Sequence, residues 1–314
     1  MEQILDIIIS TDFFYSILRI STPIIYAALG ALITSRAGVV NIGLEGMMLC
    51  AALTGVIISA FTQSAWLGLA GAVLVSVAVS LMMSYVTLVL KSHITLTGIA
   101  INTFGSGATV FVLYLVCNDK GISSSLASKT IPQVNIPLLE HVPVLGEVLS
   151  GHNILTYLSL VAVALTWVLL NKTVLGLRIR AVGESERAAM SVGAKPVRYQ
   201  FIAMTISGVL AGFGGAYMSM GYVSWFARDM IAGRGFIALA AQQLGQGTTM
   251  GTFGSALIFG MADSLANNLQ ALQMPPEFVQ SIPYAVTILG LVVFSVLQRR
   301  KELKRMKQAV SKEG

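Results

Sequence analysis

Charged residues are scarce in this sequence. Only 11% of its 314 residues are Asp, Glu, Lys or Arg, whereas 55% are hydrophobic. A soluble globular chain carries about a quarter charged residues, so this chain has too little polar surface to remain in water. The mean hydropathy of +0.78 agrees. Length alone would suggest about two soluble domains, but the composition excludes that class and favours a membrane protein.

Cysteine and the common motifs of enzyme chemistry are also nearly missing. The two cysteines, Cys50 and Cys117, lie in apolar surroundings and are expected to act as small buried hydrophobes, without a disulfide. The three histidines lack metal-ligand spacing, and neither a phosphate-binding Gly-x-x-x-x-Gly-Lys-Ser/Thr nor Gly-x-Ser-x-Gly occurs. The first twelve residues carry no Lys or Arg, so no cleavable signal peptide is expected. We expect no catalytic residue, metal or cofactor in this chain.

Long apolar segments dominate what remains. A membrane-spanning helix needs about 20 apolar residues. Candidate spans are 13–35, 38–60, 65–90, 94–117, 153–171, 197–222, 232–247, 251–272 and 282–298. The sequence therefore predicts an all-α, polytopic helical bundle of about nine transmembrane helices. Eight or ten spans are the alternatives, because Arg19 interrupts the first candidate and residues 1–18 could form a separate helix.

Lys and Arg predict the orientation of the spans, because they accumulate on the cytoplasmic side. Arg36, Lys91, the segment 172–198 and the tail 299–314 are assigned to the inside. Strict alternation then places the N-terminus outside and the C-terminus in the cytoplasm. Residues 1–298 form the transmembrane domain in this scheme. The tail, with seven Lys or Arg, is a basic cytoplasmic segment that contacts lipid headgroups.

The loop 118–152 is assigned to the outside, because it has few basic residues. It contains Pro132, Pro137 and Pro143 and alternating apolar residues. A loop of this length is uncommon in a compact chain unless it is functional or a disordered linker. We expect a partly ordered external cap; a disordered linker is the alternative.

Small residues indicate close helix packing, and two segments resemble one another. Gly208-x-x-x-Gly212, followed by Gly214-Gly-Ala216, allows helices to approach closely. Segment 41–55 resembles segment 231–245, since each has Gly, a charge and Gly ahead of a small-residue helix. In the predicted orientation the first begins inside and the second outside. This pattern fits an inverted repeat with a site near the membrane midplane, although such symmetry is weak.

Polar residues within spans are the remaining candidates for function, because they are costly in lipid and tend to line pathways. The candidate pathway residues are Asn41, Glu45, Asn102, Gln242, Gln243, Asp263 and Asn267. For each of them the alternative is an interhelical hydrogen bond that holds the bundle. For Glu45 we favour a structural role at a helix start, where a carboxylate suits the helix dipole.

The segment 181–196 is the longest polar interruption in the second half of the chain. Ser185 can cap a short helix, Gly193 can close it in the left-handed conformation, and Pro196 prevents its continuation. Five basic residues surround the helix: Arg178, Arg180, Arg187, Lys195 and Arg198. A short capped helix on the basic side of a membrane suits docking to a soluble partner. A solvated loop that merely joins two spans is the alternative.

Three motifs in this order resemble a known family. They are Ala37-Gly-Val-Val-Asn-Ile-Gly-Leu-Glu-Gly-Met-Met48, Ala181-Val-Gly-Glu-Ser-Glu-Arg-Ala-Ala189 and Gly233-Arg-Gly-Phe-Ile-Ala-Leu-Ala240. The chain resembles the permease subunits of bacterial ABC importers, in the branch with ribose-type sugar, branched-chain amino acid and nucleoside permeases. It looks most like the nucleoside (simple-sugar-like) permeases that work with a basic-membrane-protein-type lipoprotein. The likeness runs from about Arg36 to Leu272.

The resemblance implies a division of labour in a bacterial cell membrane. A solute-binding lipoprotein delivers the solute outside, two permease subunits (often non-identical) form the path, and a separate ATPase subunit binds ATP inside. Segment 183–193 matches the coupling helix that docks on the ATPase. The matching residues are Gly183, Glu184, Arg187, Ala188, Ala189 and Gly193. Ser185 and Glu186 belong to the same segment, where the family often has Asn-Pro. After Ala240 the family tends to show a Gly-aromatic stretch, which residues 242–247 lack.

The predicted function is therefore an ABC permease that imports a nucleoside by alternating access. A simple-sugar permease of the same class is the first alternative. An ion-coupled secondary transporter, with Glu45 or Asp263 as the titrating carboxylate, is the second. A membrane scaffold or receptor subunit without transport is the third. Membrane lipid is an expected partner, and nucleic acid is not.

Overall fold

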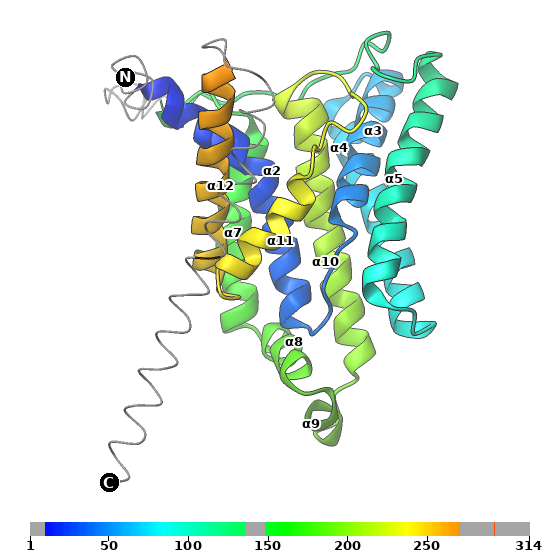
Figure 1. The fold of residues 1–314 in the computed structure, drawn as a ribbon, viewed down its shortest axis with the longest axis vertical. Coiled ribbons are helices and arrows are strands. Elements are labelled where there is room, and N and C mark those ends of the chain that lie inside the picture. Colours follow the sequence, from blue (N-terminus) through cyan, green and yellow to red (C-terminus); the bar gives the residue numbers. More distant parts are fainter. Residues whose placement is uncertain (1–9, 136–147, 271–291, 293–314) are drawn as a thin grey trace.

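The computed structural model describes residues 10–135 and 148–270, together with residue 292 (Figure 1). Every regular element in these residues is a helix, and none is a strand. The elements are α2 (Thr11–Arg36), α3 (Leu44–Thr62), α4 (Ala65–Ser84), the π-helical turn η1 (Tyr85–Val89), α5 (Ile94–Cys117), α7 (Ile154–Lys172), α8 (Val174–Glu184), α9 (Glu186–Ser191), α10 (Pro196–Tyr217), the π-helical turn η2 (Met218–Tyr222), α11 (Arg234–Leu244) and α12 (Thr249–Gln270). The predicted all-α class is confirmed for the described residues.

Six stretches among the described residues are long and apolar enough to cross a membrane. They are Thr11–Arg36, Leu44–Thr62, Ala65–Val89, Ile94–Cys117, Ile154–Lys172 and Pro196–Tyr222. The predicted spans 232–247 and 251–272 correspond to α11, with 11 residues, and α12, with 22 residues. An 11-residue helix is about 16 Å long and covers about half of the hydrocarbon core. The predicted span 282–298 lies outside the described residues, apart from residue 292.

The structure corrects the start of the second predicted span and rejects a separate first helix for residues 11–18. Residues 38–43, expected to open the second span, are not helical, and α3 begins only at Leu44. Gly38 has φ +77°, a left-handed conformation that glycine adopts readily, and the chain turns away from the axis of α2 at this residue. The suggestion that residues 1–18 form a separate helix is also wrong for residues 11–18, because α2 runs without a break through Arg19. The Arg19 guanidinium donates to the carbonyl of Tyr222 at 2.7 Å, which accommodates its charge.

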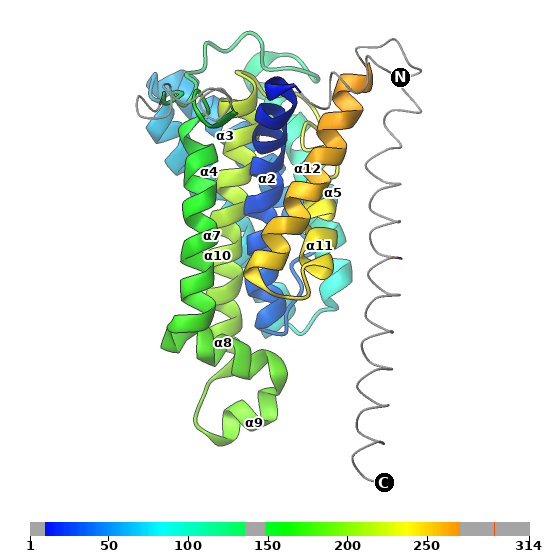
Figure 2. The same cartoon turned by 90° about the vertical axis from the view of Figure 1, so that its left-hand side faces the viewer.

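Helices α2 and α10 form the centre of the bundle. Helix α2 contacts α7, α10, α11 and α12, and α10 contacts α2, α3 and α4. Figures 1 and 2 show these long helices running side by side, with α5 at one edge and α12 at another. Because α2 lies between the other helices, residues 20–34 are all buried. Most residues of α5, in contrast, are exposed or half-buried.

Small residues on α10 allow this close packing, as the sequence predicts. A Cβ at Gly215 would overlap the carbonyl oxygen of Met48 in α3, and one at Gly212 would lie 2.8 Å from Cα of Val73 in α4. Serine hydroxyls tie the same interface, since Ser76 Oγ donates to the carbonyl of Gly208 at 2.7 Å. The small-residue face is therefore a packing surface.

The two ends of the bundle differ. Helices α8 and α9 lie beyond one end, as both views show (Figures 1 and 2). The start of α2 and the loop 118–135 lie at the other end. This part of the loop is packed on the bundle: the Lys129 N–H donates to Ser59 Oγ at 2.8 Å, and the Ile131 N–H donates to the carbonyl of Met220 at 2.9 Å. These bonds agree with a partly ordered cap; residues 136–147 lie outside the described residues.

Candidate functional site

The N-termini of α3 and α11 meet at the side chain of Glu45. Its Oε1 accepts a hydrogen bond from the N–H of Gly233 at 2.8 Å, and its Oε2 accepts one from the N–H of Gly235 at 2.7 Å. The first N–H groups of a helix have no partner inside the helix. A carboxylate from the first turn of α3 therefore caps α11, and its charge complements the positive end of the helix dipole.

A second polar side chain caps α3 itself. The side-chain oxygen of Asn102, from α5, accepts the N–H of Gly46 at 2.9 Å, and its amide group donates to the carbonyl of Ile42 at 2.8 Å. A Cβ on Gly46 would lie 2.5 Å from the carbonyl oxygen of Ile101, so only glycine permits this crossing of α3 and α5. Asn102 therefore fixes the place where the non-helical chain of residues 37–43 becomes helix.

Asn41 holds the same connecting chain from the other side. Its side-chain oxygen accepts the N–H of Gly43 at 3.1 Å, and its amide group donates to Ser207 Oγ of α10 at 2.9 Å. Asn41 is completely buried. The structure thus brings Asn41, Glu45 and Asn102 together around the start of α3, as hydrogen-bonding groups of the bundle.

The remaining predicted pathway residues are dispersed. Asp263 lies 3.3 Å from the guanidinium of Arg234 at the start of α11, in a largely buried ion pair. Gln242 is buried and donates to Ser35 Oγ at 3.3 Å, nearer the end of the bundle that carries α8. Gln243 and Asn267 are exposed. The ion pair with Arg234 therefore places Asp263 next to the start of α11, where Glu45 binds. Gln242, Gln243 and Asn267 have no such contact with the start of α11 among the described residues.

Three residues that the pathway prediction missed, Ser106, Arg228 and Asp229, lie beside this region. Ser106 donates to Oδ1 of Asp229 at 2.8 Å, and the adjacent Arg228 approaches Oδ2 at 3.3 Å. Ser106 is the thirteenth residue of the 24-residue helix α5, about 17 Å from either end. The side chains of Arg228 and Asp229 are 62% and 53% exposed. Both residues fall between the candidate spans 197–222 and 232–247, and the sequence alone gives no means to trace this segment back between the helices.

The polar segment 181–196 forms the expected capped helix. Ser185 Oγ accepts the N–H of Ala188 at 3.3 Å, Gly193 has φ +80°, and Pro196 begins α10. The Glu186 carboxylate accepts a 2.6 Å hydrogen bond from Gln200 of α10, which anchors α9 to the bundle. The predicted cap geometry is therefore confirmed.

The exposed surface of this segment has both charged and apolar side chains. The exposed predicted residues are Gly183, Glu184, Ser185, Glu186, Arg187, Ala188 and Gly193, whereas Ala189 is buried. Met190 is 54% exposed and Val192 is 82% exposed. Exposed large apolar side chains at a projecting tip suit contact with another protein. The sequence analysis did not include Met190 and Val192 among the candidate residues. Two large apolar residues within a polar segment could have indicated such a contact.

Helix α8 is in backbone contact with the chain that leads to Glu45. A Cβ on Gly183 would overlap the carbonyl oxygen of Arg36, and one on Gly38 would lie 3.3 Å from Cα of Gly183. Because both positions are glycine, the end of α8 rests directly on the α2–α3 connection. A displacement of α8 would therefore press on the segment that carries Asn41.

At the opposite end, His152 is enclosed by aromatic rings. Its ring stacks on Tyr15 with centroids 4.0 Å apart, and its Nε2 lies 2.9 Å from the carbonyl oxygen of Val148. Burial lowers the pKa of His152; the hydrogen bond with Val148 opposes this effect, and the positive charge of Arg19 adds to it. The neutral ring, donating from Nε2, is the form that suits this site.

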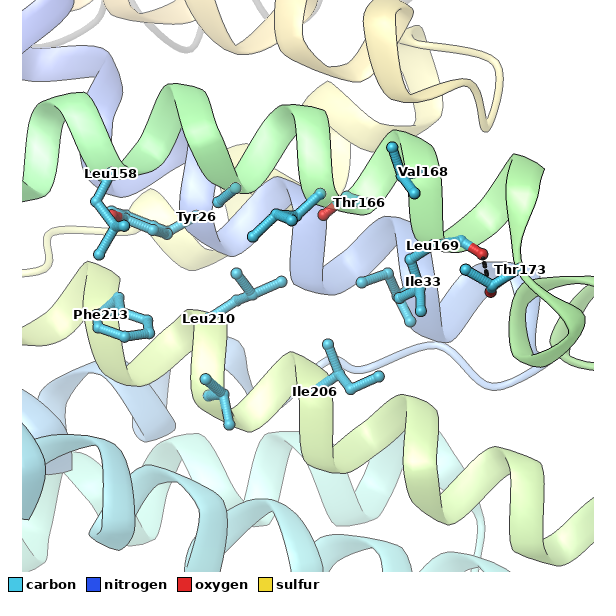
Figure 3. Close-up of a pocket in the computed structure, with 13 residues that line it drawn as sticks. Tyr26, Ile33, Leu158, Thr166, Val168, Leu169, Thr173, Ile206, Leu210 and Phe213 are labelled. Carbon is cyan, nitrogen blue, oxygen red and sulfur yellow. Dashed lines mark hydrogen bonds between the residues drawn. The ribbon is translucent and has the colours of Figure 1, made fainter.

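One cavity in the bundle is lined almost entirely by apolar side chains. It lies between α2, α7 and α10 and has a volume of about 540 Å³ (Figure 3). Its lining includes Leu158, Leu210 and Phe213. Two of its hydroxyl groups already donate to backbone carbonyls: Tyr26 to that of Leu155, and Thr173 to that of Leu169. Such a surface offers few directed hydrogen bonds to a polar solute. Among the described residues, no group of three His, Cys, Asp or Glu side chains could hold a metal ion.

Comparison with known proteins identifies the family. The family model described as "Branched-chain amino acid transport system / permease component" matches residues 13–291. No solved structure matches the chain.

Two relatives have nucleoside transport in their names. The guanosine ABC transporter permease protein NupQ of Bacillus subtilis is 35% identical over 93% of this chain and 93% of its own length. The nucleoside ABC transporter permease protein NupC of Lactococcus lactis is 32% identical over 87% of this chain and 89% of its own.

A third relative is the putative glucose ABC transporter permease protein TsgC13 of Haloferax volcanii, which is 30% identical over 85% of this chain and 87% of its own length. These relatives are transport permeases, not enzymes. With its long apolar helices, the chain is a multi-pass membrane protein. It belongs to the family of branched-chain amino acid transport system permease components.

Proposed function

We propose that this chain is the permease subunit of an ABC importer that carries a nucleoside into the cell. The observation that carries the proposal is the similarity to a guanosine permease and a nucleoside permease over nearly the whole chain. A simple sugar is the second candidate solute, because a putative glucose permease is 30% identical. The chain binds no ATP in this scheme; a separate ATPase subunit does.

The α8–α9 segment is the proposed contact with the ATPase. It lies beyond one end of the bundle, is capped at Ser185, and exposes Met190 and Val192 among charged side chains. The groups that would dock are those of residues 183–193. The contact of Gly183 with the α2–α3 connection supplies a route from the ATPase to the interior of the bundle. ATP-driven movement of α9 would reach α3 through this contact.

The meeting of α3 and α11 supports the inverted repeat. Each of these helices follows a non-helical segment, residues 37–43 or 223–233, and their N-termini meet at Glu45. In Figure 1 they extend in opposite directions from this meeting point. Discontinuous helices whose N-termini converge inside the membrane are typical of transporter binding regions. The proposal keeps nine spans, with 282–298 as the last, and a cytoplasmic C-terminus.

The solute path is proposed to follow the exposed polar surface at Ser106 and Asp229. Irregular backbone and exposed charge are tolerated at membrane depth only where they are covered by protein or line a water-filled cavity. Asp229 and Arg228 meet that description beside the middle of α5. A second permease subunit would close the path on its open side. A solute-binding lipoprotein would deliver the solute at the end opposite α9.

The test is uptake of labelled guanosine and labelled glucose into vesicles that contain the neighbouring transporter subunits, with and without this chain. Guanosine uptake that requires ATP, the ATPase and this chain is expected. If glucose is taken up and guanosine is not, the proposed solute changes to a sugar, and the chain remains an ABC importer permease. Uptake that persists without the ATPase would contradict the proposal and point to a secondary transporter.

A double variant, Glu184→Ala with Arg187→Ala, tests the coupling role. Both side chains are exposed, so the fold should persist, while ATP hydrolysis loses its connection to uptake. Lys91→Ala, an exposed basic residue between η1 and α5, is the control. Normal uptake by the double variant at normal abundance would refute the assignment of residues 183–193.

A further inference from the structure

A smaller cavity, of about 230 Å³, lies at the end of the bundle that carries α8 and α9. Its walls come from the ends of α2 and α7, from α8, and from the start of α12, whose positions at this end are visible in Figures 1 and 2. The charged and polar lining side chains are those of Arg36, Asn171, Arg180, Thr248 and Thr249. Among the described residues no Asp or Glu lines it, so the two arginines of the lining have no neutralising carboxylate there.

Two polar atoms of this lining have no hydrogen-bond partner among the described residues. They are Nε of Arg180 and Oγ1 of Thr249, and both are buried atoms. Thr249 as a whole is only 4% exposed. A buried donor without an acceptor is costly, and a charged one more so. Because nearly all buried polar groups in folded proteins are hydrogen-bonded, these two atoms call for an acceptor such as a bound anion.

The start of α12 adds further donors. Thr248 Oγ1 accepts the N–H of Gly251 at 3.2 Å, but the other N–H groups of the first turn have no acceptor within the helix. The helix has 22 residues, so its dipole places partial positive charge at the cavity. Backbone N–H groups at a helix start, together with arginine, form a typical site for a phosphate group.

The depth of the cavity indicates where the phosphate comes from. Asn171 is the next-to-last residue of the span Ile154–Lys172, and Arg36 is the last residue of the span Thr11–Arg36. Trp167, 38% exposed, also lines the cavity and is a residue type enriched at the membrane interface. The site is therefore at the level of the lipid headgroups. Basic pockets between transmembrane helices on the cytoplasmic side bind anionic headgroups.

We propose that this cavity binds a phosphate group, supplied by the headgroup of an anionic phospholipid. Arg180 and Thr249 donate to the phosphate oxygens, the first turn of α12 contributes backbone N–H groups, and Arg36 adds charge. Arg36 itself is held in place, since its Nε donates to the carbonyl of Gly247 at 2.7 Å. Because Arg180 belongs to α8, the bound phosphate links α8 to α2 and α12.

The test measures lipid binding by the full-length chain in neutral detergent, and so it does not depend on the transported solute. Three probes are added separately: phosphatidylglycerol, a glycolipid with the same acyl chains but no phosphate, and inorganic phosphate. Native mass spectrometry counts retained lipid, and the melting temperature is measured in parallel. We expect phosphatidylglycerol to be retained and to raise the melting temperature, and the glycolipid to do neither.

The variant Arg180→Gln should weaken phosphatidylglycerol binding by about tenfold or more, as expected for loss of a charged hydrogen-bond donor. Its melting temperature without lipid should not fall, because Arg180 Nε makes no hydrogen bond with the described part of the chain. Arg178→Gln is the control: Arg178 lies on the same helix but bonds to Tyr199 at 2.8 Å, outside the cavity. It should keep the response to phosphatidylglycerol.

Thr249→Val gives a second, nearly isosteric variant that should also weaken binding. Inorganic phosphate could stabilise the chain to the same degree as the lipid, with both effects abolished by Arg180→Gln. The cavity would then be a phosphate site, but one that binds free phosphate from solution rather than a lipid headgroup. If neither phosphate probe binds, or if Arg180→Gln and Thr249→Val bind as the unaltered chain does, the proposal is overturned.

Discussion

The Glu45 contact gives the sharpest prediction about how the bundle is held together. Glu45→Ala removes both acceptors from the N–H groups of Gly233 and Gly235, at 2.8 and 2.7 Å. A hydrogen bond to a charged group contributes about 1.5–3 kcal/mol. The two bonds together are therefore expected to contribute about 3 kcal/mol or more to the free energy of unfolding. Water cannot replace them easily, because the contact lies between packed helices.

The expected decrease is measurable as a melting temperature in detergent. A change of 1 kcal/mol shifts the melting temperature of a 150–250-residue domain by about 2–4 °C, so Glu45→Ala should lower it by roughly 6 °C or more. Glu45→Gln keeps one carbonyl oxygen and loses the charge, and its melting temperature should lie between those of Glu45→Ala and the unaltered chain. Fluorescence-detected size-exclusion chromatography after heating gives these values from small samples.

The matched control is Asp119→Asn. Asp119 also accepts a backbone hydrogen bond, from the N–H of Gly121 at 2.7 Å, but it is exposed. Its replacement should change the melting temperature by no more than about 2 °C, since exposed polar contacts contribute little. If Glu45→Ala melted like Asp119→Asn, the two hydrogen bonds would not hold α11 to α3, and the reasoning would be refuted.

Two further predictions concern stability. In the folded chain the pKa of His152 is below its usual 6.5. As the pH falls, His152 is therefore protonated in the unfolded chain before it is protonated in the folded chain. Stability contributed by neutral His152 is fully present above pH 6.5 and is lost as the pH falls toward the lower folded pKa; His152→Gln should remove that part of the pH dependence of the melting temperature. Gly215→Ala should destabilise the bundle by about 1–3 kcal/mol through overpacking against Met48. Gly254→Ala should not, because a Cβ there meets no atom of the described residues within 4 Å. Equal melting temperatures for the two glycine variants would contradict this packing argument.

Local features of the sequence predicted the helices and the caps well. Apolar runs identified six spans closely, because lipid demands such runs wherever a helix crosses. Ser185 and Gly193 marked the ends of α9, because a cap depends on the residue types within one turn. Gly208 and its neighbours marked the close approach of α10 to α3 and α4.

Contacts between distant segments could not be predicted in the same way. The polarity of Glu45 and Asn102 singled them out, but Gly233 is 188 residues from Glu45, and only the fold brings them together. The non-helical residues 38–43 were missed because their composition is as apolar as that of a span. Ser106 stands between Gly105 and Gly107, which indicate close packing but do not point to a polar partner. Its bond to Asp229 depends on the path of residues 223–233 back into the bundle.

The resemblance between segments 41–55 and 231–245 gains a physical reason from these contacts. Each segment places glycine at the first turn of a helix that another chain approaches closely. Gly46 must admit the backbone of α5 at Ile101, and Gly235 must admit the backbone of α3 at Glu45, because a Cβ at either position would come within 2.6 Å of those atoms. The charged residue in each motif takes part in the junction: Glu45 caps α11, and Arg234 pairs with Asp263. The two motifs are alike because both helix starts meet the same demand, a tight crossing with a charge balanced inside the membrane.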